Sequence, residues 1–119
     1  MAKKTGSATS KPARTRLPKA PKRYRSFVKR YPGLARAWDS INEAGADGPL
    51  DRRTQRLVKM AAAMGAMREG AVRSGARKAV AEGIPLAEIE QLIPLVAGIV
   101  GLPSSVACWG WVRDALDLD

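Results

Sequence analysis

Histidine is absent from this chain of 119 residues, and cysteine occurs once, as Cys108. A single thiol excludes an internal disulfide. Without histidine, and without a carboxylate cluster at convincing ligand spacing, the sequence predicts no metal site. A phosphate-binding loop of the Gly-x-x-x-x-Gly-Lys type is missing as well. We therefore expect neither a metal nor a cofactor.

The chain also lacks a long uninterrupted hydrophobic run. Its longest apolar stretch, LIPLVAGIVGLPSSVACW, is broken by Pro94, Pro103, two glycines and two serines. Two packed helices explain this stretch better than a membrane span, which needs about 20 predominantly apolar residues. No secretory hydrophobic region follows the basic N-terminus. We expect a cytoplasmic protein without a membrane partner.

Acidic residues are absent from residues 1–30, which carry eleven Lys and Arg. The remainder holds ten basic and eleven acidic residues, so the net charge of +10 is the sum of +11 and −1. Residues 1–23 contain only Met1 and Leu17 as large apolar side chains. Such a segment buries too little surface to offset its conformational entropy, so we predict a disordered tail there and a folded domain over 24–119.

This basic tail predicts affinity for polyanions, either nucleic acid or another anionic surface. Tyr24 and Phe27 lie beside its last cations and could stack on bases. The alternative is an extension with only non-specific binding. The candidate nucleic-acid contacts are Lys11, Arg14, Arg16, Lys19, Lys22, Arg23 and Arg25.

Apolar residues recur at helical spacing through the rest of the chain, and no stretch shows sustained alternation with period two. Pro32 ends a short first helix because the residue before a proline avoids the helical region, and Pro94 is expected to kink or split a later helix. The sequence predicts an all-α domain of about five to six helices. They are expected near residues 24–31, 33–45, 51–65, 67–82, 85–101 and 104–116.

Three of these helices carry a clear apolar face. The faces comprise Leu34, Trp38 and Ile41; Leu57, Met60, Ala61 and Met64; and Leu86, Ile89, Leu92, Ile93 and Val96. Asp51 suits the start of the second of these helices as a cap, and the cations Arg52, Arg53, Arg56 and Lys59 are expected on its solvent side. A domain of this size buries about 60–70% of the surface of its unfolded chain, so oligomerisation would add stability.

The order and spacing of several motifs resemble a known family. GPLDRRTQRLVKMA is followed by EGAVRS, then by RKAVAEGIPLAEIEQLIPL and GLPSSVA, within residues 31–112. This pattern resembles the carboxymuconolactone decarboxylase / alkylhydroperoxidase D-like (AhpD-like) family. The resemblance implies a compact helical fold, assembled as a homo-oligomer, a trimer or a hexamer. It also implies one of two activities, because its peroxidases use a Cys-x-x-Cys pair followed by a histidine, and its decarboxylases use histidine without that pair.

The residues that carry this chemistry are missing here. In a register anchored on Gly83, the histidine and the two cysteines fall on Gly75, Ala71 and Arg68. In a register anchored on Glu69, they fall on Ala79, Val72 and Gly75. A peroxidatic centre needs a nucleophilic thiolate and a resolving thiol, and neither register supplies them. We therefore expect a degenerate member of the family.

Glu69 is the first candidate catalytic residue. Near the start of its helix it could act as a general base if burial favoured its protonated form. The alternative is that it complements the helix dipole and pairs with Arg73 four residues on. The cations Arg68, Arg73, Arg77 and Lys78 could line a pocket for an anionic ligand, or they could form a solvated face.

Cys108 is the second candidate. A lone cysteine among apolar residues is typically a small buried hydrophobe, whereas a solitary peroxidatic thiol would need an activating cation, for which Arg113 is nearest in sequence. Two other patterns recur at helical spacing. Core or subunit packing is expected of Met60, Met64 and Met67, and close helix approach of Gly65, Gly70 and Gly75.

Three functional hypotheses follow. The first is non-redox binding of a small molecule or partner, with residual acid–base catalysis at Glu69. The second is an oligomeric nucleic-acid-binding protein that acts through its basic tail, where multivalency would strengthen weak contacts. The third is the peroxidase-like antioxidant activity that the family resemblance implies, with Cys108 as the nucleophile.

Overall fold

The computed structural model describes residues 21–118, in which the chain forms six helices and no strand. In chain order these are α1 (Lys22–Arg30), α2 (Pro32–Ala46), α3 (Arg52–Gly65), α4 (Glu69–Ala81), α5 (Leu86–Val100) and α6 (Leu102–Ala115). The prediction of an all-α fold with about five to six helices is confirmed. None of the described helices is both long and apolar enough to cross a membrane.

Local signals in the sequence place several of the helix ends. The Asp51 side chain accepts a hydrogen bond from the backbone N–H of Thr54 at 2.7 Å, so it caps α3. Gly83 and Gly101 adopt positive φ angles of 86° and 90°, which glycine tolerates without strain. Gly83 lies in the turn after α4, and Gly101 lies between α5 and α6. These features separate α4 from α5 and α5 from α6.

Pro94 does not split α5, which runs unbroken from Leu86 to Val100. The proline lies on the exposed side of the helix, where water can solvate the carbonyl group that loses its hydrogen bond. Ile89, Leu92 and Val96 are buried on either side of it along the chain and hold the helix against its neighbours. Packing therefore offsets the local cost of the proline.

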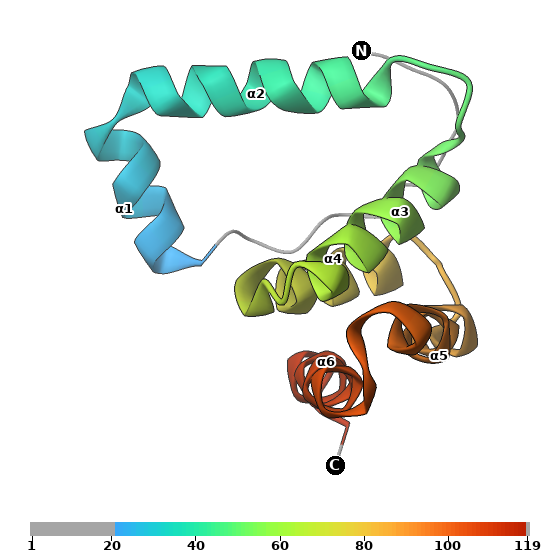
Figure 1. Ribbon diagram of the computed structural model, residues 1–119. Helices are drawn as coiled ribbons and strands as arrows, with labels where there is room; N and C mark the ends of the chain where they lie inside the picture. The colour runs from blue at the N-terminus through green and yellow to red at the C-terminus, as the bar shows by residue number, and fades with distance from the viewer. Residues whose placement is uncertain (1–20, 119) are drawn as a thin grey trace.

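Helices α3 to α6 form a bundle around one core. The principal contacts join α3 to α4 and α5, α6 to α4 and α5, and, to a smaller extent, α4 to α5. Figure 1 shows α3 and α4 lying together across the middle of the view, with α5 and α6 below them. The buried apolar residues are Met60, Ala63, Met64, Val72, Ala76, Ala79, Ile84, Ile89, Leu92, Val96, Cys108 and Val112.

Helices α1 and α2, called the arm below, extend away from this bundle (Figure 1). No residue of either helix is buried. The predicted apolar face of α2 is present, but it is not covered, because Leu34, Trp38 and Ile41 are 55%, 51% and 58% exposed. Periodicity predicted this face, but it did not show whether another part of the chain covers it.

Candidate functional site

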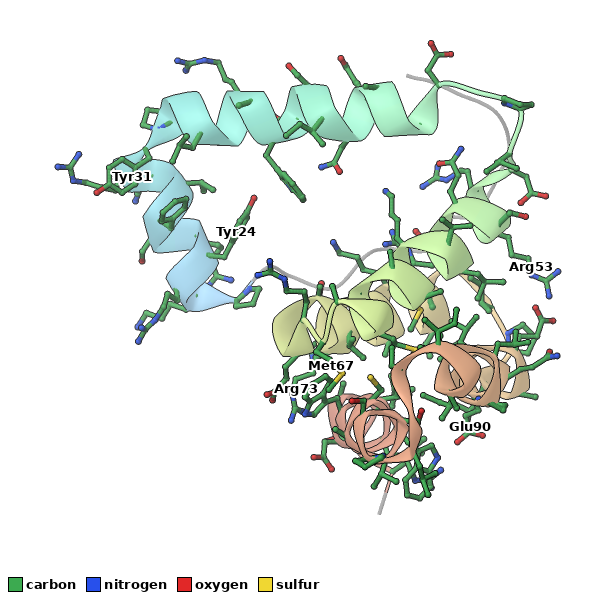
Figure 2. The ribbon with its side chains drawn as sticks, viewed as in Figure 1. Tyr24, Tyr31, Arg53, Met67, Arg73 and Glu90 are labelled. Carbon is green, nitrogen blue, oxygen red and sulfur yellow. The ribbon has the colours of Figure 1, made fainter. Side chains whose placement is uncertain are left out.

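The N-terminus of α4 carries the first predicted catalytic residue. Glu69 opens the helix, and its side chain, 52% exposed, accepts a hydrogen bond from Nε of Arg73 at 2.8 Å. An Nη atom of Arg73 also lies 3.7 Å from a carboxylate oxygen of Asp114 on α6. Figure 2 shows Arg73 close to α6, below the end of α4. Glu69 is thus part of an open ion-pair network and lacks the burial on which a general-base role would depend.

The three candidate arginines of this helix do not gather around one point. Arg73 is engaged by Glu69 and Asp114. Arg68 is exposed at the N-cap of α4, and Arg77 is half-buried. Among the residues described, no ion pair joins Arg68 or Arg77 to a carboxylate. The geometry therefore gives no shared anion pocket formed by all three.

Gly75, where one register places the family's histidine, is buried and closely covered by Met60 of α3. A Cβ atom built on Gly75 would lie 2.9 Å from Cγ of Met60, closer than real carbon atoms approach. Met60 itself is 1% exposed. A Cβ atom built on Gly65 or Gly70 would have no atom from another part of the chain within 4 Å. The expectation of close helix approach is therefore confirmed at Gly75 and wrong at Gly65 and Gly70.

Cys108 lies in the core, with 1% of its surface exposed. Its Sγ is 3.7 Å from the carbonyl oxygen of Met64 and 3.9 Å from Sδ of Met67. Burial raises the pKa of the Cys108 thiol, which favours the neutral form over the nucleophilic thiolate. Arg113, the proposed activating cation, donates to Glu90 at 3.0 Å and stacks on the ring of Trp109.

Met67 departs from the expected methionine stripe. It follows the end of α3 with a φ of 55° and is 38% exposed, whereas Met60 and Met64 are buried. The chain turns after Gly65, so the helical spacing that predicted the stripe ends there. Figure 2 shows Met67 above α6, at the end of the α3–α4 pair.

The charged face between α3 and α4 was not foreseen. Arg56 was expected in solvent, but its side chain is only 15% exposed and forms two hydrogen bonds, of 2.9 and 3.1 Å, with the carboxylate of Glu82. Burial, and then the charge of Arg56, lower the pKa values of Lys59 and Lys78. The spacing of these charged residues along each helix was visible in the sequence. That spacing did not show that α3 and α4 would bring the charges of the two helices together.

The predicted nucleic-acid contacts fall in two groups. Lys11, Arg14, Arg16 and Lys19 lie outside the residues that the structure describes. Lys22, Arg23 and Arg25 are exposed on α1. As for metals, the part of the chain that the structure describes contains no group of three His, Cys, Asp or Glu side chains able to hold an ion.

Comparisons with known proteins identify the family. The model of the carboxymuconolactone decarboxylase family matches residues 32–114. Among solved structures, the chain is similar to apo-lpg0406, a carboxymuconolactone decarboxylase family protein from Legionella pneumophila, with a TM-score of 0.71 and 22% sequence identity over 81% of this chain and 87% of that one. At this identity the likeness shows the fold alone. A search of curated proteins found no match. Because the family model covers most of its length, this chain belongs to the carboxymuconolactone decarboxylase family.

Proposed function

We propose that this protein is a non-redox member of its family that works by binding a small molecule or a partner. The packing of α4 on α3 is the observation that carries this proposal. Met60 occupies the space beside Gly75, so an imidazole at that position would have to displace a core side chain. Val72, Ala76 and Ala79 are buried on the same helix. Helix α4 therefore serves as core scaffold where relatives carry reactive groups.

The surroundings of Cys108 support the same proposal. A peroxidatic thiol must reach both the thiolate state and the hydroperoxide, and burial opposes both. Residual acid–base catalysis at Glu69 has less support than binding, because the carboxylate is exposed and paired with Arg73.

Hydroperoxide consumption by the pre-reduced protein tests this proposal directly. We expect no turnover above buffer for the wild type or for Cys108→Ser. In parallel, an aromatic disulfide reagent should label native Cys108 at least about tenfold more slowly than the urea-unfolded chain, since the thiol is buried and neutral. Turnover that Cys108→Ser abolishes would overturn the proposal and make Cys108 the nucleophile.

We also propose that the arm joins copies of this chain into an oligomer. Six large apolar side chains of the arm are 42–58% exposed: Tyr24, Phe27, Tyr31, Leu34, Trp38 and Ile41. Isolated helices of about 15 residues are marginal in water, so the arm needs a surface to pack on. A row of exposed apolar residues of this length is typical of an interaction site.

A second copy of the chain offers a surface for the arm. Helices α5 and α6 expose Leu95, Ile99, Leu102 and Val106, and Ile99 is 86% exposed. The arm and this surface differ from one another, so their contact would be head-to-tail. Head-to-tail contacts form a ring where the rotation between copies closes, and such a ring is compatible with the trimer or hexamer expected from family resemblance.

Helix α1 favours nucleic-acid binding as a second candidate function. Within nine residues it carries five cations, and it exposes Tyr24 and Phe27, which could stack on bases. Binding of single-stranded DNA should then fall steeply with salt, and it should weaken when residues 1–23, which include Lys22 and Arg23 of α1, are deleted. Equal binding by the truncated protein would show that the tail is not the binder.

A further inference from the structure

Five charged side chains gather where α3 packs on α4, and four of them are cations. Arg52, Arg56 and Lys59 recur at i, i+4 and i+7 on α3, which places them on one face of that helix. Lys78 and Glu82 are four residues apart at the end of α4 and share a face in the same way. We call this set the α3–α4 cationic cluster.

The Arg56–Glu82 pair fixes the centre of the cluster. Both hydrogen bonds of the guanidinium fork go to the Glu82 carboxylate, at 2.9 and 3.1 Å, and the two side chains are 15% and 19% exposed. The residues are 26 positions apart in sequence, so the pair ties the two helices together. The guanidinium of Arg56 is therefore engaged by Glu82 and is not available to bind a ligand in the same way.

The two lysines have no such partner. In the described part of the chain, no carboxylate lies within ion-pair distance of Lys59 or Lys78. Lys59 is exposed and Lys78 is half-buried, and reduced hydration together with the charge of Arg56 lowers the pKa values of both lysines. With one carboxylate among four cations, the cluster keeps a net charge of +3 that an anion would stabilise.

We propose that the α3–α4 cationic cluster binds a phosphate dianion, either free or as the monoester group of a small molecule, with Lys59 and Lys78 as the main ligands. This inference deepens the binding function proposed above and names the class of ligand. Ammonium groups act as point charges and donate from several directions, which suits a compact tetrahedral oxyanion. A planar carboxylate gains most from a guanidinium fork, and Glu82 already occupies that of Arg56.

Isothermal titration with inorganic phosphate, at constant ionic strength set with chloride, tests the proposal on the full-length protein. Lys59→Gln and Lys78→Gln should each weaken phosphate binding about tenfold, the size expected for the loss of one charge-assisted contact. Arg36→Gln also removes one positive charge, from an exposed position on α2, and should leave the affinity unchanged. Glu82→Gln should tighten binding, since it removes the competing carboxylate and frees the Arg56 fork.

A second measurement on the wild type does not depend on any variant folding. Phosphate should raise the pKa values of Lys59 and Lys78 toward 10.5 in an NMR titration of the lysine side chains. Absence of phosphate binding above the chloride background, or wild-type affinity in both lysine variants, would overturn the proposal. Binding of single-stranded DNA that depends on these lysines, without binding of inorganic phosphate, would also overturn it in favour of a nucleic-acid contact.

The outcome is separable from that of the peroxide assay. A protein that binds phosphate through Lys59 and Lys78 and also consumes hydroperoxide would keep the phosphate site and lose the proposed non-redox function. A protein that neither binds phosphate nor consumes hydroperoxide would contradict the phosphate site but leave the proposed non-redox function standing.

Discussion

The contact between Gly75 and Met60 limits how closely α4 packs on α3. Met60 belongs to the largest fully buried side chains of the bundle, and Gly75 presents no side chain to it. The atom that would meet a new Cβ is Cγ of Met60, near the base of the side chain, so the clash cannot be relieved by moving a flexible end. Gly75, which one of the two registers places at the family's histidine, thus has a packing role.

Gly75→Ala should destabilise the protein by about 1–2 kcal/mol. Overpacking of a core costs about 1–3 kcal/mol, and the better helix propensity of alanine returns up to about 1 kcal/mol. Gly110→Ala is the matched control, because Gly110 lies inside α6 with open space around its Cβ position. It should be neutral or stabilising. Urea unfolding of both variants measures the difference, and equal stabilities would refute the packing argument.

At the scale of single elements, the cap of α3 shows how a local signal sets a boundary. Asp51 has extended backbone angles, φ −70° and ψ 167°, and accepts from the N–H of Thr54. The hydrogen bond from the Thr54 backbone lowers the pKa of Asp51 from its ordinary value of 3.8. The charged form is therefore favoured in the folded state, as expected for a carboxylate that accepts backbone hydrogen bonds.

This shift predicts a pH dependence of stability. Since the folded pKa of Asp51 is depressed, its contribution is present above about pH 3.8 and is lost as the pH falls through the lower folded value. Asp51→Ala should lower the melting temperature near neutral pH, and its difference from wild type should shrink on acidification. Asp51→Asn keeps a good cap without the titrating group and should show a smaller change. A difference from wild type that does not vary with pH would contradict this assignment.

For the molecule as a whole, the arm is the feature that the bundle does not explain. Its two helices contact one another, and Phe27 and Tyr31 pack with ring centroids 5.2 Å apart, yet their large apolar residues stay open. Within one copy, nothing in the bundle covers this face extensively.

The double variant Trp38→Ala/Ile41→Ala should therefore lower the molar mass in solution, as measured by light scattering after size exclusion. Both side chains lie on the exposed apolar face of α2, which the proposed oligomer would bury. Glu43→Ala alters the opposite side of the same helix and should leave the mass unchanged, because Glu43 follows Ile41 by two residues. A monomeric wild type, or a double variant that keeps the wild-type mass, would exclude assembly through the arm.

The helices and their order could be predicted from the sequence, because caps, glycines, prolines and apolar spacing act over a few residues. The family could be predicted from the order and spacing of its sequence motifs. The lack of histidine and the presence of a single cysteine also argue, from the sequence alone, against a metal site and against a pair of redox-active thiols. Periodicity likewise identified the inner faces of α3 and α5, from which Met60, Met64 and Ile89 enter the core.

Three features were decided by the tertiary structure alone. Met60 fills the space at Gly75, Arg56 pairs with Glu82 across 26 residues, and the apolar face of the arm stays uncovered. Each depends on which helix lies against which. Spacing along one helix gives the direction of a face, but the neighbour that covers it is set by packing between distant segments.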